Sequence, residues 1–338
     1  MIENHSDSLE LSVIVPVFNR KDYYMQALES ITNQTCVGSL VEIIIVSNIL
    51  LKEGIEGKGV ELKVIYSDDE SLSGKIITGV LNASGEVVAF LEDDDLWEIG
   101  KIDSLLRAFE GDNALDFYHN GHTYFHHQSQ KWKRTSSNNI DHNKQALIFL
   151  NGKDVINSNR SYNLLIKNQA SYNLSSMALR RSFIMLYLNY FENFGNDFID
   201  GLIFLLSTIF GRKLAIENTK FTKIRLHPTN RSGLDINRGN DHYKDSFDRV
   251  IEISSSKVIN SNINQFITRI KVDGYLKSID YSRFDLLKLF LRHIIASFSC
   301  IRFPDRDIVI KTALALVSPS LLRKFLVIYH GTTSPAQK

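Results

Sequence analysis

Four consecutive carboxylic acids, Glu92 to Asp95, directly follow the apolar run Val87–Leu91. Adjacent carboxylates repel each other, and each raises the pKa of its neighbour unless a cation lies between them. A divalent ion such as Mg²⁺ or Mn²⁺ removes this cost and takes water and phosphate oxygens as further ligands. An acidic turn that caps a helix beginning near Trp97 is the alternative, because acids are favourable at helix N-termini.

Strand and helix signals alternate through the first hundred residues. Continuous runs of apolar and β-branched residues are typical of strands buried on both faces of a parallel sheet. The expected strands are Leu11–Phe18, Val41–Val46, Leu62–Tyr66 and Val87–Leu91, with helices at Lys21–Gln34 and Gly74–Ala83. This alternation predicts an α/β fold with a doubly wound, mostly parallel sheet flanked by helices. Ligands of such sheets bind beyond the carboxyl ends of the strands, where the four acids lie.

The pattern is less regular from Asp116 to Arg160, which predicts loops and short strands. A strand that leads into a helix is expected at Leu174–Phe183, a buried helix at Asp197–Phe210 and a strand at Leu214–Ile224. After Gly233 the chain becomes polar, and the remainder has helical spacing. The expected helices there are Asp245–Ser254, Ile263–Leu276, Arg283–Ser299, Asp305–Val317 and Ser320–Tyr329. We therefore predict a first domain at 1–233 and a C-terminal helical region at 234–338.

Composition excludes several classes of protein. Lysine and arginine together number 39 and aspartate and glutamate 38, so the net charge of +1 provides no global basic field for nucleic acid. Cys36 and Cys300 are the only cysteines, which excludes a disulfide framework and a four-cysteine metal site. The polar N-terminus does not resemble a signal peptide, and no segment has the roughly 20 apolar residues of a spanning helix. We expect a cytoplasmic protein.

Three motifs occur in the order and spacing of a known family. They are LSVIVPVFNR at 11–20, VEIIIV at 41–46 and ASGEVVAFLEDDDLW at 83–97. These motifs resemble those of family 2 glycosyltransferases with the GT-A fold, and the resemblance extends over residues 10 to about 232. It implies an enzyme that moves a sugar from a nucleotide-sugar donor to a hydroxyl acceptor with inversion. It also implies Mg²⁺ or Mn²⁺ on the donor diphosphate, where the metal acts as a Lewis acid.

The resemblance also assigns roles to the acids. In the family, the first acid lies near the donor ribose and a later one binds the metal; Glu92 and Asp94 hold these positions. Asp93 is expected beside them as a second contact to metal and donor. Glu92 departs from the family's aspartate by one methylene. His227, in RLHPTNRSG, matches a family histidine that approaches the metal or the diphosphate, although a loop histidine held by hydrogen bonds is an alternative. Arg225 and Arg231 flank it and either pair with phosphate oxygens or are solvated.

The family's general base lies in a Glu-Asp pair that opens a helix. The segment at 195–200 stands in that place, where Asp197 matches the aspartate and Asn196 replaces the glutamate. The resemblance implies that Asp197 takes the proton from the attacking acceptor hydroxyl. Asp200, one helical turn later, is the second choice. Alternatively, Asp197 only caps the helix that follows.

The turn after the first strand matches the family's pocket for the nucleotide base. The residues concerned are Pro16, Phe18, Asn19 and Arg20. At the second strand the family's DDGS becomes SNIL, so the usual aspartate that contacts uracil is missing and the donor nucleotide stays open. Ser47 and Asn48 can still hydrogen-bond a base. Lys75 follows a matching Ser-x-Gly turn and either contacts the donor phosphates or is a solvated helix lysine.

An acceptor site is expected near Phe117–His127, which holds four of the ten histidines. Metal binding is one interpretation, but alternating histidine and aromatic residues are more typical of a strand or loop edge beside a pocket. Aromatic faces suit the CH surfaces of sugars. We therefore expect weak acceptor contacts from Tyr118 and His119, together with Asp95 and Trp97.

Charge is unevenly distributed along the chain. Residues 277–338 carry ten Lys or Arg and four Asp, a net charge of +6, which leaves −5 on residues 1–276. Basic amphipathic helices suit an anionic cytoplasmic membrane face, so peripheral attachment is expected. The family resemblance implies a glycan or lipid-linked acceptor, which agrees with this expectation. The alternative is that these helices pack on the catalytic domain or on a second subunit.

Two other functions remain open. A nucleotidyltransferase also needs a carboxylate-held metal on a nucleotide phosphate, but PVFNRKDYY at 16–24 does not resemble its phosphate loop. A catalytically degenerate family member that binds glycans or partners is the other alternative. The missing acid of the second strand and the Glu92 and Asn196 replacements motivate it.

Overall fold

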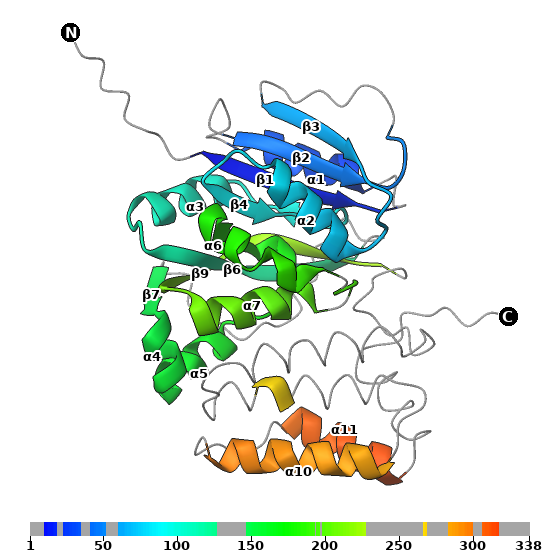
Figure 1. Ribbon diagram of the computed structural model, residues 1–338, viewed down its shortest axis with the longest axis vertical. Helices are drawn as coiled ribbons and strands as arrows, with labels where there is room; N and C mark the ends of the chain where they lie inside the picture. The colour runs from blue at the N-terminus through cyan, green and yellow to red at the C-terminus, as the bar shows by residue number, and fades with distance from the viewer. Residues whose placement is uncertain are drawn as a thin grey trace, which may run out of the picture. The chain divides into compact units, whose positions relative to one another are not determined.

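Four parallel strands, in the order β3-β2-β1-β4, form one half of a nine-stranded sheet in the computed structural model (Figure 1). Their bounds are Glu61–Tyr66 for β3, Val41–Ser47 for β2, Leu11–Val17 for β1 and Val87–Phe90 for β4. β1, β2 and β4 are buried along their whole length, as their continuous apolar sequences predict, whereas β3 is partly exposed. The predicted strands are thus confirmed, and their carboxyl ends lie at one edge of the sheet.

The other half of the sheet is mixed. It comprises β8 (Met177–Arg180), β6 (Leu115–His126), β9 (Lys213–Leu226), β5 (Leu96–Trp97) and β7 (Leu147–Asn151). β8 runs antiparallel to both β4 and β6, β9 runs parallel to β6, and the short strands β5 and β7 run antiparallel to β9. The α/β class with a mostly parallel sheet is therefore confirmed, with antiparallel strands added in this half.

β6 corrects the expectation of loops and short strands over residues 116–160. It is a single strand of 12 residues, although the polar residues His119 and Asn120 lie in it. Both side chains are buried and find partners inside the protein: the Asn120 amide donates to Thr222 Oγ1, and His119 Nε2 lies 3.0 Å from the Tyr172 carbonyl oxygen. Hydrogen bonds such as that of the Asn120 amide allow polar residues to be buried in the strand, but these residues hide its apolar pattern in the sequence.

Helices cover both faces of the sheet (Figure 1). They are α1 (Tyr24–Thr32), α2 (Leu72–Asn82), α3 (Lys101–Glu110), α4 (Gly152–Asn157), α5 (Asn159–Lys167), α6 (Arg181–Leu186) and α7 (Ile199–Phe210), with short 3₁₀ turns at Leu174–Ser176 and Leu188–Phe191. α2 begins at Ser71, whose side chain accepts a hydrogen bond from Gly74 N. It packs so closely on β1 that a Cβ at Gly79 would lie 2.5 Å from Ile14 Cγ2.

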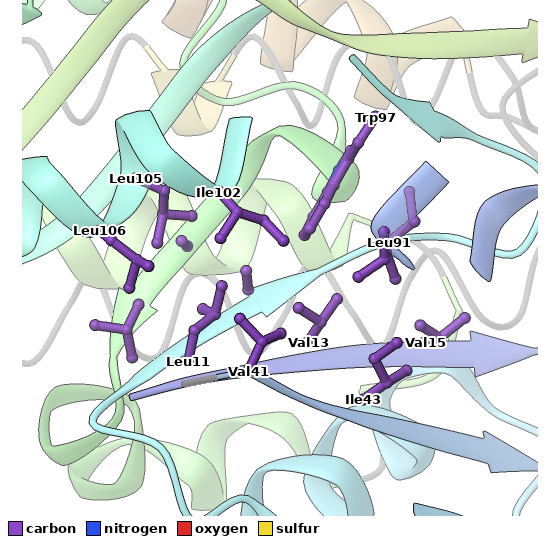
Figure 2. Close-up of a cluster of buried hydrophobic side chains, with 14 of the residues drawn as sticks. Leu11, Val13, Val15, Val41, Ile43, Leu91, Trp97, Ile102, Leu105 and Leu106 are labelled. Carbon is purple, nitrogen blue, oxygen red and sulfur yellow. The ribbon is translucent and has the colours of Figure 1, made fainter. Parts of the chain in front are cut away.

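A cluster of buried aliphatic side chains fixes the strand ends (Figure 2). Residues of β1 and β2 pack there against α3 and against Trp97. The labelled members include Leu11, Val13, Val15, Val41, Ile43, Ile102, Leu105 and Leu106. Each fully buried Leu, Ile or Val contributes about 1.5–3 kcal/mol of burial free energy. The loops at the carboxyl ends of these strands are therefore attached to strands that are held in place by this packing.

The structure describes residues 10–18, 23–34, 41–51, 60–126, 147–192, 194–196, 198–227, 266–268, 283–299 and 306–317. The chain divides into two compact units, Met1–Leu226 and His227–Lys338. The boundary that we predicted at 233/234 stays a prediction, because residues 228–265 lie outside the described ranges.

In the second unit, α10 (Arg283–Ser299) has the predicted bounds, and α11 (Arg306–Val317) begins one residue after its predicted start. The two helices pack against each other. The predicted helices Asp245–Ser254 and Ser320–Tyr329 lie outside the described residues, as does most of Ile263–Leu276. Within the described ranges, no helix is long and apolar enough to cross a membrane.

Candidate active site

The acidic loop, Glu92–Asp95, begins directly after β4 and is held against the end of β1. The Phe18 backbone N–H donates to Asp93 Oδ2 at 2.7 Å, which joins the residue after β1 to the loop. The side chains of Asp93, Asp94 and Asp95 are all buried. A solvated acidic turn is therefore excluded, because three carboxylates lie inside the protein at the carboxyl edge of the sheet.

Asp95 faces inward and is held by three hydrogen-bond donors. Its Oδ2 accepts from Ser175 Oγ at 2.7 Å and from Asn173 Nδ2 at 3.0 Å, and its Oδ1 accepts from the Arg225 backbone N–H at 3.1 Å. Burial, together with the nearby charge of Asp94, raises the pKa of Asp95 to about 7. Asp95 thus supports the loop from inside, which disagrees with its expected contact to an acceptor.

Arg225, at the end of β9, donates a hydrogen bond to the backbone of the acidic loop. Its Nε donates to the Asp94 carbonyl oxygen at 2.9 Å and its Nη2 to Gln26 Oε1 at 2.8 Å. The guanidinium lies between the rings of Tyr23 and Phe125, 4.6 Å from each centroid. Arg225 is buried, so its interpretation as a solvated arginine is wrong, whereas its pairing with phosphate oxygens stays a prediction.

Several residues predicted to bind the donor come together at the ends of β1 and β2. Lys75 Nζ donates to the Val17 carbonyl oxygen and to Asn48 Oδ1, both at 2.8 Å, and lies 3.6 Å from the Phe18 ring centroid. Lys75 is fully buried, so it is not a solvated helix lysine. Ser47 Oγ is engaged locally, since it donates to the Ile49 carbonyl oxygen and accepts from Ile49 N.

The loop before α7 docks on the N-terminus of α2. Asn196 Oδ1 accepts from the Leu72 backbone N–H at 2.7 Å. Ser73 and Gly195 exchange two hydrogen bonds of 3.0 Å, and Gly195 has the φ of +86° that glycine tolerates. The residue that replaces the family's glutamate therefore caps a helix and fixes the chain next to the predicted base.

Three of the predicted site residues lie outside the described residues: Asn19, Arg20 and Asp197. Pro16 is buried within β1. His227 directly follows β9, is half-buried and belongs to the second unit, so its role as a ligand stays a prediction.

The expected weak acceptor contacts disagree with burial at three positions. Trp97, Tyr118 and His119 are buried, with Tyr118 and His119 at 0% exposure. The Trp97 indole N–H donates to the Ser175 carbonyl oxygen at 2.9 Å. Burial lowers the pKa of His119 to about 3, so this imidazole is neutral. Tyr118 and His119 therefore lie in the buried interior of the protein.

Two supporting residues, Ser175 and Lys101, were not predicted from the sequence. Lys101 is fully buried, and its Nζ donates to Asn120 Oδ1 at 2.5 Å and to the Ser175 carbonyl oxygen at 2.8 Å. Burial lowers its pKa well below the usual value, although the negative charge of Asp95 opposes this shift. The one sequence feature that could have indicated Lys101 is its position four residues after Trp97. In the structure, Lys101 Nζ lies 4.5 Å from the Trp97 ring centroid.

The part of the sequence that forms β1, β4 and the acidic loop matches a family model. The sequence model of "Glycosyl transferase family 2" covers residues 12–181, half of the chain. The chain belongs to glycosyl transferase family 2.

Curated relatives of this family 2 chain include two named bacterial proteins. The minor teichoic acid biosynthesis protein GgaB of Bacillus subtilis is 28% identical over 144 residues, which is 38% of this chain and 16% of GgaB. Glycosyltransferase GlyA of Streptococcus pneumoniae is 31% identical over 134 residues, which is 35% of this chain and 18% of GlyA. The chain thus spans less than a fifth of the length of either relative.

Among solved structures, residues 1–349 of S. aureus TarS in complex with UDP-GlcNAc share the fold. The TM-score is 0.58 at 12% sequence identity, and the match covers 95% of this chain and 92% of the TarS chain. At this identity the likeness shows the fold alone.

The carboxylates of this family 2 chain fit a divalent metal in one respect. Within the described ranges, no three His, Cys, Asp or Glu side chains come close enough to hold a metal ion. Mg²⁺ in phosphate sites, however, is usually bound by one or two carboxylates, with water and phosphate oxygens completing the shell. Asp93 and Asp94 are adjacent and buried, and they follow β4, so they could provide the one or two carboxylates of such a site.

Proposed function

We propose that this chain transfers a sugar from a nucleotide-sugar donor to a hydroxyl group of a glycan or lipid-linked acceptor. The observation that carries the proposal is the buried acidic loop, tied through Asp93 to the Phe18 amide at the carboxyl ends of β1 and β4. Ligands of doubly wound sheets bind at this edge. Membership of the family supplies the reaction class.

The donor occupies the edge formed by the ends of β1, β2 and β4. The nucleotide lies near Phe18, Asn48 and Lys75, whose side chains converge there. The TarS structure with UDP-GlcNAc supports a nucleoside diphosphate sugar as donor. Ser47 and Asn48 replace the family's acids, so the choice between uridine and guanosine is made by neutral hydrogen-bonding groups.

Asp94 and Asp93 are the proposed ligands of Mg²⁺ or Mn²⁺. The metal would neutralise negative charge on the leaving diphosphate. Asp197 is the proposed general base, and transfer in a single displacement inverts the anomeric configuration. The docking of Asn196 and Gly195 on α2 supports this assignment, because it fixes the chain directly before Asp197.

The acceptor is proposed to be presented at an anionic membrane surface. In α10 the exposed side chains Leu287, Leu291 and Ile295 are spaced by four residues, which places them in one line along the helix. Lys288 and Arg292 are exposed beside this line. An apolar line next to cations suits the boundary between acyl chains and anionic headgroups. The role of GgaB in teichoic acid biosynthesis supports a surface polymer as acceptor.

Donor turnover tests the proposal. We expect Mn²⁺-dependent hydrolysis or transfer from at least one UDP- or GDP-sugar, measured as nucleoside diphosphate release. Asp94→Ala and Asp197→Ala should lower kcat by about 10²–10⁴-fold. Asp103→Asn is the matched control, because Asp103 is an exposed acid that pairs with Arg107 on α3. Absence of turnover with every donor would favour a degenerate binding protein. Unchanged activity in both variants would refute the roles proposed for Asp94 and Asp197.

A further inference from the structure

The segment Asn173–Ser175 lies between the acidic loop and α7. It precedes β8 and includes the start of the 3₁₀ turn Leu174–Ser176. No motif of the sequence marks it, and both of its polar residues are buried. It bonds on one side to Glu92 and Asp95 and on the other to Asp200, in the first turn of α7. It therefore connects the two parts of the protein to which donor binding and proton removal are assigned.

Ser175 fastens the acidic loop through its side chain. Ser175 Oγ accepts from the Glu92 backbone N–H at 3.0 Å and donates to Asp95 Oδ2 at 2.7 Å. A single hydroxyl thus holds both ends of the four-residue acidic loop. Because this hydroxyl is fully buried, water cannot replace it when it is removed.

The Ser175 carbonyl oxygen is in turn held by three donors. They are Trp97 Nε1 at 2.9 Å, Lys101 Nζ at 2.8 Å and Thr222 Oγ1 at 3.2 Å. These donors come from β5, α3 and β9, so three separate elements fix the position of this residue. The buried Lys101 thereby has a role: its amino group donates a hydrogen bond to the carbonyl oxygen of Ser175 and so helps to hold the serine in place.

Asn173 connects the loop to α7. Its side-chain Nδ2 donates to Asp95 Oδ2 at 3.0 Å, and its backbone N–H donates to Asp200 Oδ2 at 3.0 Å. It adopts a φ of +71° and ψ of 110°, which is unfavourable for a residue with a Cβ and persists only where surrounding contacts determine it. The two hydrogen bonds and the closure of the turn by Ser176 N on the Asn173 carbonyl oxygen are such contacts.

We infer that Asn173 and Ser175 are positioning residues that hold the acidic loop and the N-terminal turn of α7 in one fixed geometry. This inference rests on the proposed function, in which the loop binds the donor and α7 follows directly on the base. A group-transfer reaction requires its reacting groups within a fraction of an ångström, and a misplacement of about 1 Å costs roughly 100-fold in rate. We therefore expect substitution of either residue to lower kcat under conditions where the variant is still folded.

The test uses the full chain with Ser175→Ala and Asn173→Gly. Glycine tolerates the positive φ and keeps the backbone N–H to Asp200, so Asn173→Gly removes the amide without straining the turn. Ser207→Ala is the matched control: Ser207 lies on α7, is fully buried, and its Oγ has no hydrogen-bond partner among the described residues. It therefore changes a buried serine without removing a hydrogen bond.

We expect both positioning variants to lower kcat by about 10–100-fold well below their melting temperatures, with the donor KM changed less than kcat. Amide hydrogen exchange, which is independent of activity, should become faster in the peptide that contains residues 92–95, while Ser207→Ala changes neither readout. Equal loss in Ser207→Ala, or kcat and exchange within twofold of wild type in both variants, would overturn the inference. If Ser175→Ala does not fold, Asn173→Gly decides alone. An inactive wild-type protein would instead refute the proposed function, and the inference with it.

Discussion

At the scale of single residues, Glu42 shows what a buried carboxylate does away from the site. It lies on β2 and accepts hydrogen bonds from Ser12, Ser84 and Lys63, with the ammonium at 2.6 Å. Burial alone raises the pKa of Glu42, but the hydrogen bonds from Lys63, Ser12 and Ser84 outweigh it and lower the pKa to about 2. Glu42 therefore ties β1, β2 and β3 together at the edge opposite to the acidic loop.

We expect Glu42→Gln to lower the free energy of unfolding at pH 7 by about 1–3 kcal/mol, less than the full pKa shift corresponds to, because the partner Lys63 is partly exposed to solvent. Because the folded-state pKa is depressed, this stabilisation is complete above the unfolded pKa near 4.5. It is lost as the pH falls toward 2, so the difference between variant and wild type should shrink over that range. Urea unfolding followed by tryptophan fluorescence measures it in the first unit, where both tryptophans lie. Glu61→Gln is the control, because Glu61 also pairs with Lys63 but is exposed; an equal effect there would contradict the prediction.

The acids were predictable from the sequence, but their supports were not. Glu92 to Asp95 follow an apolar run, and this local pattern predicted their place at a strand end. Ser175 is 80 positions from Asp95, and Arg225 is 131 positions from Asp94, so only the folded chain brings them together. The same reason explains why the burial of Tyr118 and His119 was not predicted, because it depends on strands and helices distant in the sequence.

At the scale of elements, the agreement between the strands and helices expected from the sequence and those of the structure depended on how each element is stabilised. β1, β2, β4 and α10 carry their apolar pattern within their own residues, so the sequence predicted them. β6 depends on buried hydrogen bonds to neighbouring elements, such as that between Asn120 and Thr222 of β9, and was predicted as loops. Periodicity detects apolar burial but not a polar group that is satisfied across strands.

The end of β9 provides a prediction at this scale. Arg225 joins β9 to the acidic loop and to α1 through the Asp94 carbonyl oxygen and Gln26. In Arg225→Lys, a flexible ammonium replaces the planar group between Tyr23 and Phe125, so it cannot stack on both rings and keep both hydrogen bonds. We expect a drop in kcat of about 10–100-fold with the protein still folded. Arg107→Lys, which alters an exposed pair on α3, should retain activity; wild-type kcat in Arg225→Lys would show that β9 does not position the loop.

At the scale of the whole molecule, a net charge of +1 conceals opposite charges on two stretches of the chain. The −5 of residues 1–276 and the +6 of residues 277–338 give the C-terminal helices their own electrostatic preference. Attraction of basic helices to anionic lipids is screened by salt, whereas apolar insertion is not. The exposed line on α10 combines both contributions, so each of them can be altered separately.

Vesicle co-sedimentation of the full chain is therefore expected to show binding to vesicles rich in phosphatidylserine, and much weaker binding to phosphatidylcholine alone. Leu291→Asp should abolish binding, since it places a carboxylate in the apolar line. Lys288→Gln with Arg292→Gln should lower the affinity and flatten its dependence on salt, because each basic residue near the surface contributes about 1 kcal/mol. Leu186→Asp is the matched control, because Leu186 is 72% exposed on the first unit. If Leu291→Asp leaves binding unchanged, or converts a dimer to a monomer in light scattering, α10 contacts protein rather than lipid.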